Sequence, residues 1–298
     1  MRIQSECKPV MEFLLSLRLF RNRTHQKRFD LNQKWKEEVG MSFSKEQLEY
    51  IDTDAFEQSL LYLDQHLLLS DVQPKGIMEF LQQIKSGQWP ENHPRNPYSI
   101  QSGGKEIYEI LRAWYDGYYH KIEARVTAGL WTQKQRADKI IDKYPLVQAV
   151  EHVTNGIYLE DIKSRTVILT PHYHWRPIVL YKDYEDVSYY AYSADDLVLF
   201  RETIAPYYLR VQQALSDERR LALLRLLVGT TKSFGEIHEE MGLAKSTVHH
   251  HIITLRAAGL VRVHSTYGKN DRYSYREEGM DAMTLRLQQF LHGGEQSL

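Results

Sequence analysis

Apolar residues recur at helical spacing through the first half of the chain. Residues 9–20, 56–67 and 77–84 each repeat apolar side chains at intervals of three or four. The stretch from Ile107 to Ile122 keeps the same spacing throughout, so it predicts one long amphipathic helix. This part of the chain is therefore expected to be mainly helical.

The pattern changes after Asn155 and Gly156. Three short runs rich in β-branched or aromatic residues follow, separated by polar turns, at residues 166–170, 178–181 and 187–192. They predict a small antiparallel sheet. The fold class expected for the chain is therefore mainly α with a small antiparallel sheet (α+β).

A domain boundary is expected near residue 200. Pro206 is well placed to open a new helix, and at about 100 to 200 residues per domain the chain length predicts two domains. We expect residues 1–200 to form a helical N-terminal domain that ends in the small sheet. Residues 201–298 are expected to form the second domain.

The pattern of residues 207–298 predicts four helices, a hairpin and a final helix. A short helix from Ser233 to Met241 is closed by Gly242, and another helix starts at Lys245. Two helices around a tight glycine turn, followed by a hairpin, form a winged helix-turn-helix. In that arrangement the second helix enters the major groove of DNA.

The predicted recognition helix has an apolar face and a polar face. Val248, Ile252 and Leu255 are spaced to face the core. The first turns of the opposite face carry short hydroxyls and imidazoles that can reach base edges: Ser246, Thr247, His249 and His250. The neighbouring His251 is expected to be partly buried.

Charge indicates a nucleic-acid partner only locally. The whole chain has a net charge of −1, with 38 Lys and Arg against 39 Asp and Glu. Between Leu243 and Arg276, however, Asp271 is the only acidic residue among several basic ones. Three of these basic residues are placed to hold the phosphates of double-stranded DNA: Lys245, Lys269 and Arg272.

Three stretches of the C-terminal region form a specific combination. Residues 215–221 read Leu-Ser-Asp-Glu-Arg-Arg-Leu, residues 246–252 read Ser-Thr-Val-His-His-His-Ile, and residues 255–261 read Leu-Arg-Ala-Ala-Gly-Leu-Val. Together they resemble the winged helix of the ArsR (arsenical-repressor-like) family of bacterial transcriptional regulators, with His249 in place of a usual serine. The resemblance covers roughly 90 residues.

The resemblance implies a DNA-binding transcriptional regulator. Members of the family form homodimers, partly through helices that here correspond to about 207–215 and 280–291, so a pseudo-palindromic operator is expected. The metal-sensing members carry paired Cys, or Asp and His, ligands that this sequence lacks. Neither a metal nor another cofactor is therefore expected.

The N-terminal 200 residues must supply a further function. Most of the chain's 20 tyrosines lie between Tyr98 and Tyr208. Aromatic side chains with a polar tip suit a pocket for a small organic effector, and the ligand-binding residues expected here are Trp114, Tyr115, Tyr118 and Trp175. This domain is expected to dimerise, to sense a small molecule, or both.

Two other kinds of protein fit the same sequence. An enzyme could carry an autoregulatory winged helix, or a protein-interaction scaffold could bind a protein through its basic wing. Enzymatic activity is not expected, because no defensible catalytic triad can be assembled from the sequence.

Two sets of side chains have the spacing of metal ligands. Asp116, His120 and Glu123 share a helical spacing, while His172 and His174 alternate onto one face of a strand. A solvated helix face and a packed strand explain these spacings more simply than a metal site does.

Composition excludes a disordered chain and a membrane-spanning one. The sequence is 42% hydrophobic and 26% charged, which is typical of a globular protein, and no apolar run approaches the roughly 18 residues that span a bilayer. The N-terminus lacks the pattern of a signal peptide, and Cys7 is the single cysteine. A cytoplasmic protein without a membrane partner is therefore expected.

Overall fold

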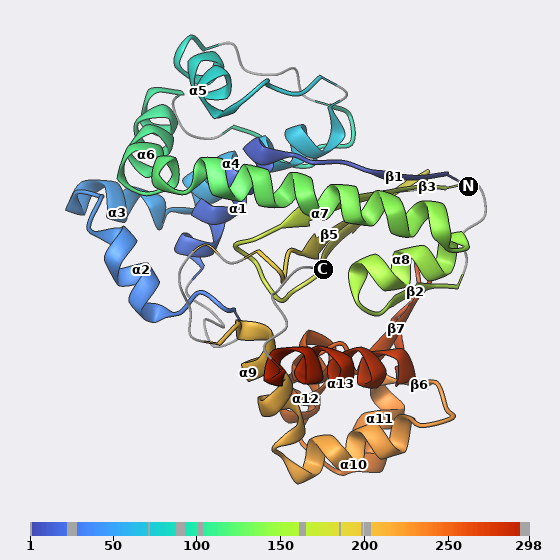
Figure 1. Cartoon of the computed structure of the whole chain (residues 1–298). Helices are drawn as coiled ribbons and strands as arrows, with labels where there is room; N and C mark the ends of the chain where they lie inside the picture. The colour runs from blue at the N-terminus through green and yellow to red at the C-terminus, as the bar shows by residue number, and fades with distance from the viewer. Residues whose placement is uncertain are drawn as a thin grey trace. The chain divides into compact units, whose positions relative to one another are not determined.

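The computed structural model describes residues 2–22, 29–70, 72–87, 93–100, 104–160, 165–184, 186–197, 199 and 204–292 (Figure 1). The chain divides into two compact units. One, the helical unit, consists of Cys7–Trp131 and His172–Arg176, and the other, the mixed unit, consists of Met1–Glu6, Thr132–Pro171 and Pro177–Leu298. The boundary predicted near residue 200 falls among positions outside the described residues, and it stays a prediction.

The helical unit is built around α1, whose side chains are almost all buried. α1 packs against α4 and α5, and Ser44 and Thr53 cap the helices that follow them, which satisfies otherwise unpaired backbone N–H groups. Its elements are α1 (Pro9–Arg21), α2 (Gln33–Gly40), α3 (Lys45–Ile51), α4 (Asp54–Leu69), α5 (Ile77–Lys85), α6 (Gly104–Gly117), the 3₁₀ turn η2 (Tyr119–Lys121) and the first part of α7 (Glu123–Lys143).

The long helix predicted from Ile107 to Ile122 is interrupted, so that prediction is wrong. α6 ends at Gly117 and α7 starts at Glu123. A Cβ atom on residue 117 would lie 2.3 Å from the Cβ of Ser42, so only glycine fits this approach. Consequently Asp116, His120 and Glu123 do not share the face of one continuous helix.

The sheet predicted for residues 166–192 is present, but it is mixed and not purely antiparallel. Its strand order is β1 (Arg2–Ser5), β3 (Thr166–His172), β5 (Val187–Ser193) and β4 (Leu180–Asp183). β4 and β5 are antiparallel, whereas β1 and β3 are parallel. A parallel pair needs a long connection, and here residues 6–165 provide it, with most of the helical unit followed by α8 and β2.

A second four-stranded sheet contains the wing. Its order is β2 (Ile157–Leu159), β7 (Val261–Ser265), β8 (Arg272–Tyr275) and β6 (Lys232–Ser233). β7 and β8 form the predicted antiparallel hairpin, and β2 adds to β7 in parallel (Figure 1). β2 directly follows α8 (Leu146–Thr154), which ends at Asn155 in the left-handed conformation with φ 56°.

The C-terminal part has the element order predicted from the sequence. Its helices are α9 (Pro206–Leu215), α10 (Glu218–Leu227), α11 (Phe234–Met241), α12 (Lys245–Ala257) and α13 (Glu277–Leu291). Val248, Ile252 and Leu255 of α12 are buried in one core with residues of α10 and α11, as predicted. Leu223, Leu224 and Leu227 of α10 face this core, whereas Leu221 is 48% exposed.

Candidate nucleic-acid interface

The turn between α11 and α12 is fixed by local hydrogen bonds. Ser233 and Glu236 form a capping box at the start of α11. Gly242 ends the helix with φ 62°, a left-handed conformation that favours glycine. The Nδ1 atom of His238 lies 2.7 Å from the carbonyl oxygen of Leu243 and links the two sides of the turn.

α12 presents the predicted polar residues on its first turns. Lys245, Ser246, His249 and His250 are exposed, and Thr247 is half-buried. No side chain caps the start of α12, where Ala244 is the N-cap residue. The first N–H groups of a helix without such a cap can bind an anion, so this end of α12 combines exposed polar side chains with a helix N-terminus that no side chain caps.

His251 points away from this surface. Its side chain is buried, as expected from the sequence. Burial lowers the pKa of His251 below its ordinary value, although the nearby Asp217 carboxylate acts in the opposite direction. Burial therefore favours the neutral form of the His251 ring, whose side chain lies in the interior of the helix-turn-helix.

The two predicted phosphate contacts of the wing lie in different environments. Lys269 is exposed on the turn between β7 and β8. Arg272 is also exposed, but its Nη2 atom donates to the carbonyl oxygen of Thr231 at 2.6 Å and lies 3.5 Å from the Glu236 carboxylate. Arg272 thus links β8 of the wing to Glu236 in the first turn of α11 and to the segment just before it.

The base of the wing is held by ion pairs that the sequence did not reveal. Arg262 Nε donates to Glu151 at 2.6 Å, and Arg276 Nη1 donates to Asn155 Oδ1 at 2.7 Å and to the carbonyl oxygen of Gly259 at 3.0 Å. Two of the basic residues between Leu243 and Arg276 are therefore neutralised or buried. No local signal links Glu151 to this stretch, since they are more than 100 residues apart.

Side chains near β2 and β3 also touch the hairpin. The Glu160 carboxylate lies 2.9 Å from Nδ1 of His264, whose Nε2 lies 2.8 Å from Ser274 Oγ. The guanidinium of Arg165 lies 3.7 Å from the ring centre of Tyr267 on the wing turn. Residues that precede the helix-turn-helix in the chain therefore contact both β7 and the turn of the wing.

The aromatic residues predicted to bind a ligand mostly form the core of the helical unit. Trp114 is fully buried and donates to Ser16 Oγ at 2.8 Å, and Tyr118 Oη lies 2.9 Å from His174 Nε2. Tyr115 is half-buried and donates to Glu123 at 2.7 Å. These hydrogen bonds satisfy the polar tips of the three rings.

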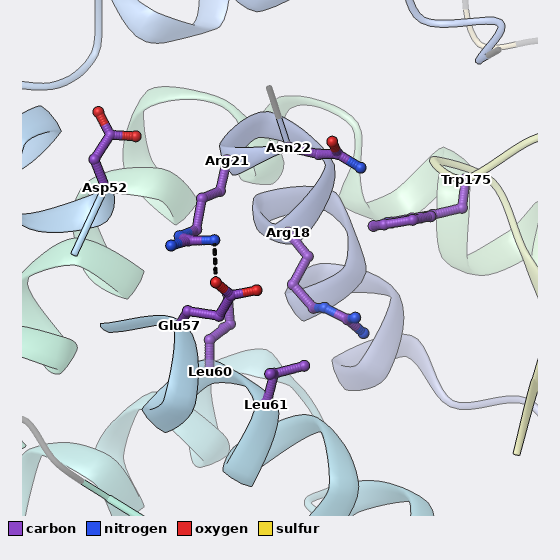
Figure 2. Close-up of a pocket in the computed structure, with 8 residues that line it drawn as sticks. All are labelled: Arg18, Arg21, Asn22, Asp52, Glu57, Leu60, Leu61 and Trp175. Carbon is purple, nitrogen blue, oxygen red and sulfur yellow. Dashed lines mark hydrogen bonds and ion pairs between the residues drawn. The ribbon is translucent and has the colours of Figure 1, made fainter. Parts of the chain in front are cut away.

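Trp175, the fourth predicted residue, lines a cavity of about 390 Å³ in the helical unit. Figure 2 shows Arg18 and Arg21 of α1 on one side of this cavity and Leu60, Leu61 and Glu57 of α4 on the other. Arg21 forms an ion pair with Glu57 at 2.6 Å, and Arg18 pairs with Asp64.

His172 and His174 are buried, and the ring of His174 is fully engaged. Its Nδ1 atom pairs with Glu12, and that carboxylate also accepts the backbone N–H groups of Tyr173 and His174 at 3.1 and 3.0 Å. Among the residues that the structure describes, no group of three or more His, Cys, Asp or Glu side chains is arranged to hold a metal ion. None of the helices in the described ranges has both the length and the apolar character needed to cross a membrane.

Comparison with known proteins places the C-terminal region among DNA-binding regulators. Residues 215–264 match the family model of a helix-turn-helix domain. YceK of Bacillus subtilis (strain 168), an uncharacterized HTH-type transcriptional regulator, is 37% identical over 84 residues, which are 28% of this chain and 80% of YceK. The crystal structure of NolR from Sinorhizobium fredii aligns with 30% of this chain and 87% of NolR at 24% identity and a TM-score of 0.24. Through its C-terminal helix-turn-helix region, the chain belongs to the HTH-type transcriptional regulators.

Proposed function

We propose that the protein is a transcriptional regulator of the ArsR type that binds double-stranded DNA as a homodimer. The observation that carries the proposal is the start of α12. There, exposed Ser246, His249 and His250 surround a helix end without a side-chain cap. Such a helix end can receive a phosphate while the side chains reach into the major groove.

The proposed roles divide the residues into two groups. Ser246, Thr247, His249 and His250 contact base edges, because hydroxyl and imidazole groups can both donate and accept hydrogen bonds there. Lys245, Lys269 and Arg272 contact phosphates. Arg272 is already oriented by Thr231, so less side-chain entropy is lost when its remaining N–H groups meet a phosphate.

The proposed dimer interface uses α9 and α13. Exposed apolar side chains lie on both helices, and the rings of Tyr208 and Phe290 pack together at 4.6 Å between centroids. The exposed apolar side chains are Leu209, Leu285, Leu287 and Leu291. A second copy would remove these side chains from water, and two-fold symmetry would place two α12 helices on a pseudo-palindromic operator.

Residues 1–200 are proposed to sense a small molecule, to support dimerisation, or both, in a cytoplasmic protein without catalytic activity. The pairing of β2 with β7 supports a regulatory role, because a segment that precedes the helix-turn-helix is hydrogen-bonded into the wing sheet. The winged helix is thus attached to the preceding region by a strand pair as well as by the chain.

Selection from a random double-stranded DNA pool tests this function. We expect an enriched motif with two-fold symmetry at about 150 mM salt, where purely electrostatic binding is suppressed. The control is the variant Ser246→Glu with His250→Glu, which keeps the buried face of α12 but repels phosphate. Equal enrichment by both proteins, or no motif from a folded dimer, would contradict the proposal.

A further inference from the structure

A second cavity, of about 380 Å³, lies in the mixed unit. Much of its wall is apolar or aromatic, with contributions from α7, α8, β5, α9 and α13: Ala137, Ile140, Val153, Tyr192, Tyr207 and Ala282. This volume is in the range of small-molecule sites, which are lined mainly by apolar groups with a few polar ones. We refer to it as the junction cavity.

The charged groups of the junction cavity leave an excess of positive charge. Arg136, Lys139 and Arg286 line it, together with Asp195 and Asp196. Asp196 lies 2.8 Å from Arg136 and 3.9 Å from Arg286, so its charge is already compensated.

The second carboxylate is compensated as well. Asp195 accepts hydrogen bonds from Ser193 Oγ and from Arg210 Nη2, both at 2.6 Å. With both carboxylates paired, the exposed ammonium of Lys139 adds a further positive charge at the cavity. An anionic group of a ligand is therefore favoured over a cationic one.

The junction cavity also borders the attachment of the recognition helix. Ala258, which follows α12 directly, and Asn155, which ends α8, both line it. A Cβ atom on Gly259 would lie 2.6 Å from the Asn155 side chain, so the Gly259 backbone is tightly packed against this side chain next to the cavity. A bound molecule would therefore touch α7 and α8 as well as Ala258, directly after α12, and the first ten residues of α13.

The cavity of Figure 2 is less suited to an anion, although two arginines line it. Arg21 donates to the carbonyl oxygen of Ile51 at 2.8 Å and to Glu57 at 2.6 Å, and Arg18 is paired with Asp64. A ligand carboxylate would have to displace a carboxylate of the protein from either guanidinium. The junction cavity offers Lys139 without such an exchange.

We propose that the junction cavity binds a small aromatic monocarboxylate, with its ring against Tyr192 and Tyr207 and its carboxylate toward Lys139. This inference deepens the proposed function and rests on it in one respect, namely that the bound acid acts as the effector. It would change DNA affinity by binding unequally to the arrangements of α12 that do and do not fit DNA.

Calorimetric titration of the full chain with indole-3-acetate and with its neutral counterpart indole-3-acetamide tests the site. We expect the acid to bind at least about tenfold more tightly than the amide, because the positive charge of the cavity discriminates between them. Equal affinity for the two compounds, or no binding of the acid up to about 10 mM, would overturn the proposed ligand class.

Variants locate the binding. Lys139→Glu reverses an exposed charge at the cavity and is expected to weaken acid binding about tenfold. Ala282→Trp places a large side chain from an exposed position of α13 into the cavity and is expected to abolish binding. Lys45→Glu, an equal charge reversal on exposed α3 in the helical unit, is the matched control and should bind the acid normally. If Lys139→Glu and Ala282→Trp both bind the acid as tightly as the wild type does, the acid does not bind in the junction cavity.

DNA binding is measured separately, by fluorescence anisotropy with the selected duplex. Saturating acid is expected to change the DNA dissociation constant about fivefold or more, and an unchanged constant would overturn the effector role. Failure to select any duplex contradicts the proposed function, whereas the calorimetry reports on the junction cavity independently of DNA.

Discussion

Asn155 occupies the space that a side chain at Gly259 would need. Gly259 has φ 75°, and a Cβ atom there would lie 2.6 Å from both the Oδ1 and the Nδ2 atoms of Asn155. Arg276 Nη1 bridges the pair, since it donates to Asn155 Oδ1 and to the Gly259 carbonyl oxygen. The end of α8 and the end of the recognition helix are thereby locked together.

Gly259→Ala is therefore expected to lower the free energy of unfolding by about 3 kcal/mol, from left-handed strain and from steric overlap. Gly242→Ala is the control, because its φ is 62° and a Cβ there meets nothing within 4 Å; it should cost only about 1 kcal/mol. Urea unfolding measures both. If Asn155→Gly does not reduce the cost of Gly259→Ala, the overlap is not its cause.

Glu151→Gln is expected to loosen the base of the wing. Glu151 is buried between Arg262 at 2.6 Å and Arg276 at 3.4 Å, and removal of a buried charge from such a group costs about 3 kcal/mol. Hydrogen exchange of the Val263 N–H, which donates to the Gly156 carbonyl oxygen, should accelerate. Glu278→Gln removes an exposed partner of Arg262 and should cost under about 1 kcal/mol; equal effects of the two changes would refute this assignment.

Acid is expected to destabilise the winged helix through His251. Burial holds the folded-state pKa of His251 below its unfolded value of about 6.5, so the neutral ring is favoured in the fold. Its contribution is fully present above pH 6.5 and is lost as the pH falls from there toward the folded pKa. Thermal unfolding of His251→Leu should show a weaker decline below pH 6.5. If the variant loses stability below pH 6.5 as steeply as the wild type does, the acid sensitivity comes from other histidines.

Variants of the proposed base-contacting residues and of the proposed phosphate-contacting residues should change different properties of DNA binding. Thr247→Ala and His250→Ala are expected to reduce discrimination between operator and random duplex. Lys269→Ala should weaken binding to the operator and to the random duplex alike. It should also lower the slope of log binding constant against log salt concentration by about one unit. Lys232→Ala is the control, because Lys232 is paired with Glu240 at 2.7 Å. The roles would be wrongly assigned if the three test variants behaved alike in anisotropy titrations.

Charge on α13 is expected to separate the proposed dimer. Leu287→Glu combined with Leu291→Glu places two carboxylates one turn apart on the exposed apolar surface of α13, so sedimentation should show a monomer that has lost affinity for the two-fold duplex. Gln288→Glu with Gln289→Glu adds the same charge at neighbouring exposed polar positions and should remain dimeric. A monomeric wild-type protein would remove the basis of this prediction.

The helix-turn-helix was predictable because its signals are local. Ser233, Glu236 and Gly242 fix the ends of α11 through hydrogen bonds within a few residues, and the spacing of Val248, Ile252 and Leu255 orients α12. The same spacing predicted which polar residues of α12 are exposed. The sequence by itself therefore determined the C-terminal element order and most of the candidate interface.

Only the tertiary structure decided which distant segments pair. β1 joins β3 across the helical unit, and β2 joins the wing, because a strand completes its hydrogen bonds with whichever edge the packing brings to it. Glu151 neutralises arginines more than 100 residues away, and position 117, where α6 ends, has no room for a side chain because Ser42 fills the adjacent space. Burial and shape in the folded chain decide which distant residues become partners. The local spacing of residues along the sequence does not predict them.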